Sequence, residues 1–263
     1  MRTIFIADAH LEEPGDHNYR LMLEFLRSLE GSTENLFIMG DLFDFWLGFP
    51  SNPFTQYQPV LDALFRLRQS GCRIVYFEGN HDFHLGPLFE QQLSAQVHKG
   101  PAVVTVQGKR LYLCHGDQIN PHDSGYRFLR AMLHNRLVAA AVNHFPPSLA
   151  VMIKSRLQHT SQAGYAAKSE RWDYRALIMS AAASARDNGC DGLVTGHFHI
   201  AFCEQLENST FTVLSLGDWM EKFTYGEMVA GKLSLRCFTS HSASGSGDRL
   251  TPETAVTVTP RLF

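Results

Sequence analysis

Five short apolar runs recur along the first three quarters of the chain, and each is followed at once by a polar loop. They cover residues 3–7, 35–39, 74–78, 110–114 and 192–195. Such runs predict buried strands. Apolar residues at helical spacing lie between them, with Leu21, Phe25 and Leu29 after the first run and Val60, Leu64 and Leu67 after the second. The alternation predicts an α/β (α+β) fold in which helices cover buried sheets.

The pattern changes after Gly196. Residues 211–216 and 232–238 resemble sheet strands joined by turns, and the stretch 240–247 is rich in Ser and Gly. We therefore expect one main domain over residues 1–240 and a mobile C-terminal tail over 241–263.

A long helical insertion interrupts the main domain at about residues 123–187. The apolar spacing runs through Tyr126, Leu129, Leu133, Leu137, Ala141 and Phe145. Pro146-Pro147 must end this helix, and Leu149, Ile153 and Leu157 begin another. The insertion is therefore predicted to form a cap of at least two helices.

The cap differs in charge from the rest of the chain. Between residues 126 and 175 there are eight basic and two acidic residues, a net +6, whereas the 263-residue chain has a formal net charge of −3. A basic, apolar-rich cap would attract an anionic amphiphile or an acidic membrane surface. The alternative is a solvated helical face whose apolar stripe belongs to the core.

The composition bears on the compartment of the cell in which the protein works. The hydrophobic fraction of 44% supports a sizeable core, and no apolar run approaches the roughly 20 residues that span a bilayer. The five scattered cysteines are typical of reduced thiols. The first apolar run is too short for a secretory signal and leads directly into Asp8. We expect a cytoplasmic protein.

The polar loops that end the strands share one chemistry. They read Asp8-Ala9-His10, Gly40-Asp41, Gly79-Asn80-His81-Asp82, His115-Gly116-Asp117 and Gly196-His197-Phe198-His199. Oxygen and nitrogen donors without cysteine suit Mn²⁺, Fe²⁺ or Zn²⁺. The pattern predicts a two-metal site, most often built for phosphoester hydrolysis.

Each candidate metal ligand can be assigned to one of two ions or to a bridge between them. Asp8 and His10 lie two apart, so that both would project to one side of a strand end and share one ion, which His199 completes. His115 and His197 would hold the second ion, Asn80 would add a neutral oxygen, and Asp41 is the candidate bridge. Gly40 is expected to let the second metal approach the backbone.

These motifs resemble the calcineurin-like metallophosphoesterase family, whose pattern D-x-H, G-D, G-N-H-[DE], H and G-H-x-H is matched at every element. The resemblance implies a double β-sandwich flanked by helices, and two bridged metal ions that activate the attacking water. It also implies that His81 acts as the acid or charge stabiliser and that Asp82 orients it. The alternative for Asp82 is a cap on the following turn.

A narrower resemblance, to the branch of this family that acts in lipid A biosynthesis, lies in three segments. They are residues 40–48, His115-Gly116-Asp117 followed by Asp123 and Tyr126, and Leu216-Gly217-Asp218-Trp219. The resemblance implies hydrolysis of UDP-2,3-diacylglucosamine, a nucleotide-linked glycolipid, to UMP and 2,3-diacylglucosamine 1-phosphate (lipid X). It also implies acyl chains beneath the cap and peripheral association with the cytoplasmic face of the inner membrane.

The same resemblance implies six substrate-contacting residues. These are Asn80, Asp123, Tyr126, Ser161, Lys168 and His197. Two positions depart from the branch: His81 stands where arginine is common, and Tyr165 where asparagine is usual. His81 restores the general phosphoesterase pattern. Two other functions therefore stay open, a phosphoesterase acting on a nucleotide or soluble phosphorylated metabolite and a non-catalytic metal-binding scaffold.

Overall fold

The computed structural model describes residues 2–48, 54–133, 135 and 172–239, without the side chains of Tyr126, Leu129 and Leu133. Most of the predicted cap and the predicted tail, 241–263, lie outside these ranges. Pro146-Pro147, Ser161, Tyr165 and Lys168 are therefore not placed.

The first sheet contains three of the predicted strands as parallel neighbours. Its six strands follow the order β13-β12-β1-β2-β4-β6, in which β12 and β13 run antiparallel at one edge. The strands are β1 (Arg2–Ile6), β2 (Asn35–Ile38), β4 (Arg73–Phe77), β6 (Gln96–His98), β12 (Thr224–Val229) and β13 (Lys232–Cys237).

The second sheet has five strands in the order β10-β11-β9-β8-β7. The three central strands are parallel and the two outer ones pair antiparallel. The strands are β7 (Ala102–Val106), β8 (Lys109–Cys114), β9 (Gly192–Thr195), β10 (Ala201–Gln205) and β11 (Thr212–Leu216). A small third sheet pairs β3 (Trp46–Leu47) with β5 (Asp82–Phe83). Two short helical turns, η1 (Thr55–Tyr57) and η2 (Leu88–Gln92), complete this region.

Alternation along the strands divides the core into layers. Phe5 and Phe37 share a buried cluster with Leu113 and Leu214, which fills the space between the two sheets. Ile4, on the other face of β1, belongs to a second cluster with the helices α1 (His17–Leu29) and α2 (Gln58–Gln69). Successive residues of a strand point to opposite faces, so both faces of this sheet must be covered. The predicted double β-sandwich flanked by helices is confirmed.

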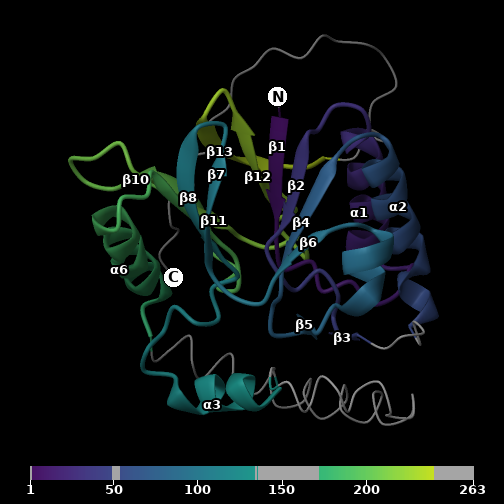
Figure 1. The fold of residues 1–263 in the computed structure, drawn as a ribbon, viewed down its shortest axis with the longest axis horizontal. Coiled ribbons are helices and arrows are strands. Elements are labelled where there is room, and N and C mark those ends of the chain that lie inside the picture. Colours follow the sequence, from purple (N-terminus) through teal and green to yellow (C-terminus); the bar gives the residue numbers. More distant parts are fainter. Residues whose placement is uncertain (1, 49–53, 134, 136–171, 240–263) are drawn as a thin grey trace, which may run out of the picture.

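The predicted helices that cover the first sheet are α1 (His17–Leu29) and α2 (Gln58–Gln69). Their buried residues include Leu21, Phe25, Leu29, Val60, Leu64 and Leu67, which are the positions that the helical spacing singled out. Both helices lie on one side of the sandwich in Figure 1. The strand boundaries differ from the predicted runs by at most one residue at each end.

Two further helices bound the predicted cap. α3 (Ser124–Leu133) lies at the end of the sandwich toward which β1 runs from the N-terminus (Figure 1). α6 (Tyr174–Asp187) packs on the second sheet, where Ile178 and Ala182 share a cluster with Leu193 and Val213. The segment predicted as insertion thus includes, at its end, a helix that covers a sheet of the main domain. Within the described ranges, no helix is both long and apolar enough to cross a membrane.

Candidate metal centre

The predicted ligands converge at one end of the sandwich because each follows the carboxyl end of a parallel strand. Asp8 and His10 follow β1, Asp41 follows β2, Asn80 follows β4, His115 follows β8, and His197 and His199 follow β9. Both sheets contribute, since β1, β2 and β4 belong to the first and β8 and β9 to the second. A site between two sheets can be assembled only when the fold is complete.

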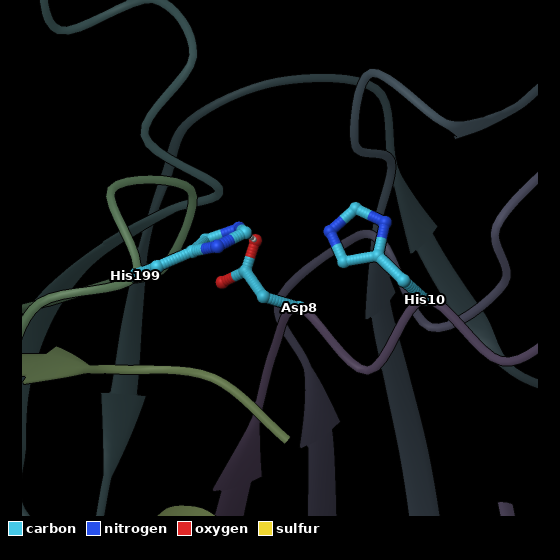
Figure 2. A group of neighbouring side chains, drawn as sticks. All are labelled: Asp8, His10 and His199. Atoms are coloured by element: carbon cyan, nitrogen blue, oxygen red, sulfur yellow. Dashed lines mark ion pairs between the residues drawn. The ribbon is translucent and has the colours of Figure 1, made fainter. Parts of the chain in front are cut away.

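Asp8, His10 and His199 form the first ligand group. One donor atom from each lies within 4.8 Å of the others, and His199 Nε2 is 3.5 Å from Asp8 Oδ1. Figure 2 shows His10 and His199 on either side of the Asp8 carboxylate. The three residues come from two sheets, yet they meet as predicted.

Asp41, His115 and His197 form the second ligand group by the same measure. Asn80 Oδ1 lies 3.0 Å from His115 Nε2. Asp41 Oδ2 lies 3.3 Å from Nε2 of His115 and 3.8 Å from Nε2 of His10, one histidine of each group. This single carboxylate therefore lies beside a histidine of each group.

The first group contains buried polar atoms that the protein itself does not satisfy. Asp8 Oδ1 and His10 Nε2 are buried and have no hydrogen-bond partner. Such atoms carry a large desolvation cost unless a charge or a hydrogen bond compensates it. A divalent cation would satisfy both, and the oxygen and nitrogen donors suit Mn²⁺, Fe²⁺ or Zn²⁺. The residues present fit two divalent ions.

Burial sets the protonation state of two of the histidines. It lowers the pKa of His10 to about 4 and, together with the nearby His115, that of His197 to about 4. Both rings are consequently neutral at pH 7, which is the form that binds a metal ion. Burial opposes ionisation of Asp41, but His115 and His81 hold its pKa well below the usual range. The Asp41 carboxylate is thus available as a ligand.

His115 is oriented by the backbone. Its Nδ1 lies 2.8 Å from the carbonyl oxygen of Met39, and because a carbonyl only accepts, Nδ1 must donate. This leaves Nε2 facing Asp41 and Asn80. Histidine ligands are commonly fixed in this way, through the ring nitrogen that does not face the ion.

The ligand loops are backbone-strained, which the sequence did not predict. Asp8, His10 and His199 have φ of 52°, 42° and 53°, and Asp41 and His197 have φ of 53° and 69°. A left-handed conformation costs a residue other than glycine on the order of 1 kcal/mol or more. Because β1 ends at Ile6, strand alternation is not what brings Asp8 and His10 to one ion, contrary to the prediction. The left-handed turn does so.

The missing side chain of Gly40 has a role that the sequence analysis did not predict. A Cβ on this residue would lie 2.6 Å from His115 Nδ1 and 2.9 Å from Gly79 Cα, and its φ is +91°. The absent side chain makes room for the His115 ring and for the neighbouring loop. A Cβ on Gly79 would lie 2.0 Å from Asp41 Oδ1. Both glycines therefore shape the surroundings of Asp41.

The expected roles of Asp82, to orient His81 or to cap the following turn, are also corrected. Its carboxylate accepts the backbone N–H groups of Asp41 at 2.9 Å, Leu42 at 2.7 Å and Gly79 at 3.0 Å, and the Tyr76 hydroxyl at 2.6 Å. Burial and the Asp41 charge raise the pKa of Asp82 to about 7, while these donors act in the opposite direction. Asp82 positions the Asp41 loop.

His81 is held by a residue that the sequence analysis missed. Its Nδ1 donates to the carbonyl oxygen of Asp44 at 2.8 Å, and its ring meets His10 edge to face, with centroids 4.6 Å apart. Because the acceptor is the backbone carbonyl of residue 44, the residue type at this position gave no sequence signal for the contact. With Nδ1 engaged, His81 Nε2 remains for a substrate.

Four of the six predicted substrate residues belong to the described part of the chain. Asn80 and His197 belong to the metal centre, Asp123 directly precedes α3, and Tyr126 lies within α3. α3 is tied to the centre by Arg130, whose Nε lies 2.6 Å from Asp117 Oδ2 and whose guanidinium also donates to the carbonyl oxygen of Lys99. Ser161 and Lys168 lie outside the described residues.

Comparisons with known proteins show which proteins this chain is similar to. A family model described as Calcineurin-like phosphoesterase matches residues 1–201. A Haemophilus influenzae protein named UDP-2,3-diacylglucosamine hydrolase is 30% identical, over 84% of this chain and 92% of the relative. A Psychromonas ingrahamii protein of the same name is 27% identical, over 89% and 96%. Among solved structures, an archaeal phosphodiesterase has 12% identity and a TM-score of 0.47, over 90% of this chain and 100% of the other.

Replacing Gly79 with alanine should disturb the Asp41 carboxylate without touching a ligand directly. The new methyl group would overlap Asp41 Oδ1, so that side chain must move. We expect affinity for Mn²⁺ to fall on the order of 10-fold or more, measured by titration calorimetry of metal-free protein. Gly15→Ala is the matched control, because nothing lies within 4 Å of its Cβ. Unchanged Mn²⁺ binding in Gly79→Ala would refute this account of the glycine.

Asp82→Asn should loosen the Asp41 loop. The amide would present N–H donors to backbone N–H groups, leaving about one or two buried donors unpaired, at about 1–3 kcal/mol each. We expect a lower midpoint of thermal unfolding in metal-free protein together with weaker Mn²⁺ binding. Asp62→Asn, at an exposed helix position, is the control. If only turnover changes, Asp82 acts in the reaction after all.

Proposed function

Because the chain belongs to the calcineurin-like phosphoesterase family and is a metal-dependent hydrolase, we propose that it hydrolyses the pyrophosphate bond of UDP-2,3-diacylglucosamine, giving UMP and 2,3-diacylglucosamine 1-phosphate. The observation that carries the proposed chemistry is the place of the Asp41 carboxylate, which lies near His10 of the first group and His115 of the second. The substrate is supported by relatives of that name at about 30% identity over most of the chain.

The proposed ligands follow the geometry. Asp8, His10 and His199 hold one ion, Asn80, His115 and His197 hold the other, and Asp41 serves both. We propose Mn²⁺ for both positions. Two divalent ions supply a water of lowered pKa and neutralise charge on the phosphate. The Asp44 carbonyl fixes the His81 ring through Nδ1, so that Nε2, when the ring carries both protons, can donate a hydrogen bond or a proton to a phosphate oxygen.

The cap residues that are described support an acylated substrate. Phe128 and Met132 lie four residues apart on α3 and are 67% and 53% exposed. Residues at this spacing share one face of a helix. An exposed apolar face beside a phosphate-binding centre suits acyl chains attached to an anionic head group. With such a substrate, the enzyme would work in the cytoplasm, peripherally on the cytoplasmic face of the inner membrane.

One observation favours a second candidate function. His81 matches the general phosphoesterase pattern and not the arginine common in the lipid A branch, so a nucleotide or soluble phosphorylated metabolite is the alternative substrate. Turnover of UDP-2,3-diacylglucosamine and of deacylated UDP-glucosamine, measured with Mn²⁺ present, tests the two. A clear preference for the acylated substrate supports the proposal, and equal turnover supports the alternative.

His81→Ala should lower turnover on the order of 10²–10⁴-fold with both ions retained, the usual range for a positioned acid or base. Metal analysis by mass spectrometry shows whether both ions are retained. His81→Arg is the companion variant, because it restores the residue common in the lipid A branch. Activity kept in His81→Arg would identify charge stabilisation as the role of this position. Loss of both ions in His81→Ala would instead make His81 structural.

Charging the apolar face of α3 should affect acylated substrates alone. Each buried methylene contributes up to about 0.8 kcal/mol, so Phe128→Asp with Met132→Asp should raise KM for the diacylated nucleotide severalfold or more. Turnover of a small phosphodiester should stay within about twofold. Val229→Asp, at a 48% exposed position on β12, is the matched control. An unchanged ratio of long-chain to deacylated substrate would contradict an acyl site on α3.

A further inference from the structure

Three residues outside the first ligand group hold its backbone, Asn18 and Lys222 through their side chains and Trp219 through its main-chain N–H. In the turn that carries Asp8 and His10, the Trp219 N–H donates to the Asp8 carbonyl at 3.0 Å, and Asn18 Nδ2 donates to the Ala9 carbonyl at 2.9 Å. Trp219 Nε1 in turn donates to the Asn18 carbonyl at 3.3 Å. The start of α1 and the loop between β11 and β12 thus fix one side of this group.

Lys222 holds the other side. Its ammonium donates to the His199 carbonyl at 3.1 Å and pairs with Asp218. Asp218 is itself fixed, because its Oδ1 accepts the N–H groups of Met220 at 3.1 Å, Glu221 at 2.9 Å and Lys222 at 3.2 Å. A lysine this restrained is not a freely moving surface charge, although its side chain is 45% exposed.

The second ligand group contacts the first through backbone, because the Asp41 carbonyl accepts the N–H groups of Ala9 at 2.8 Å and His10 at 3.0 Å. It also has supports that the first group does not share. Asp82 holds the Asp41 loop, the Met39 carbonyl holds the His115 ring, and Thr195 donates to the His115 carbonyl at 3.0 Å. Within the described residues, the side-chain hydrogen bonds of Lys222 reach only the first group and its own loop. Lys222 is therefore a direct support of the first group alone.

We propose that Lys222, clamped by Asp218, is a positioning residue that keeps His199 in its left-handed conformation for the first ion. The proposal rests on the ligand assignment made above. His199 has φ of 53°, a strained conformation that relaxes when its restraints are removed. Losing the ammonium should therefore weaken one ion and leave the other unchanged.

The sign of the effect separates this role from a purely electrostatic one. Lys222→Met removes a positive charge near the ion and leaves the Asp218 carboxylate unpaired. Both changes would attract a cation more strongly. A positioning role predicts weaker binding, and an electrostatic role predicts tighter binding.

The experiment is a calorimetric titration of metal-free protein with Mn²⁺ alone. We expect two ions in the wild type and, in Lys222→Met, one affinity lowered on the order of 10-fold or more with the other within about twofold. Lys222→Arg should restore it, and Lys232→Met, at an exposed position on β13, should have no effect. In a His199→Ala background, adding Lys222→Met should not change the ion that remains.

Asn18→Ala removes the bond to Ala9 on the opposite side and should weaken the same ion, which keeps the test available if Lys222→Met does not fold. Equal weakening of both ions, tighter binding, or no change in a folded Lys222→Met protein overturns the proposal. A wild type that takes up fewer than two Mn²⁺ overturns the ligand assignment and this proposal together. Two ions without turnover of the acylated nucleotide would refute the proposed substrate alone.

Discussion

A buried carboxylate on Asp41, with a histidine of each ligand group within 4 Å, is the constraint around which this end of the molecule is built. Burial opposes its charge, and His115 and His81 counter that cost. Gly40 and Gly79 have no side chain where the His115 ring and the Asp41 carboxylate lie. Asp82 accepts the backbone N–H groups of Asp41 and Gly79. Removing any of these leaves a buried charge that is misplaced or unpaired.

The fold was predictable because its signals are local. Strand runs, helical spacing and polar loops at strand ends each indicate a local structure within a few residues. The structure confirms the helix that contains Leu21, Phe25 and Leu29, and it confirms the strand β9. The convergence of the ligands was predictable for the same reason, since parallel strands bring their carboxyl ends to one edge. Motif order along the chain was sufficient to place Asp8 and His199 together.

What the sequence did not reveal depends on contacts between distant segments. The residues next to Asp82 in the sequence do not indicate that its carboxylate accepts the N–H of Asp41, which is 41 residues away. Nothing local to Gly40 says that the His115 ring will occupy the place of its side chain. The left-handed φ of His199 is equally invisible, because neither its own residue type nor that of a neighbour requires it. These features are set by packing between loops.

α3 shows how a helix can be attached without burying all its apolar residues. An amphipathic pattern usually indicates a face turned to the core, yet Phe128 and Met132 are exposed. The helix is instead tied down by Arg130, whose side chain is 13% exposed and pairs with the buried carboxylate of Asp117, two residues after His115. An ion pair this deeply placed resists solvent screening better than a surface pair. Among the described side chains of α3, this polar contact therefore attaches the helix while Phe128 and Met132 stay exposed.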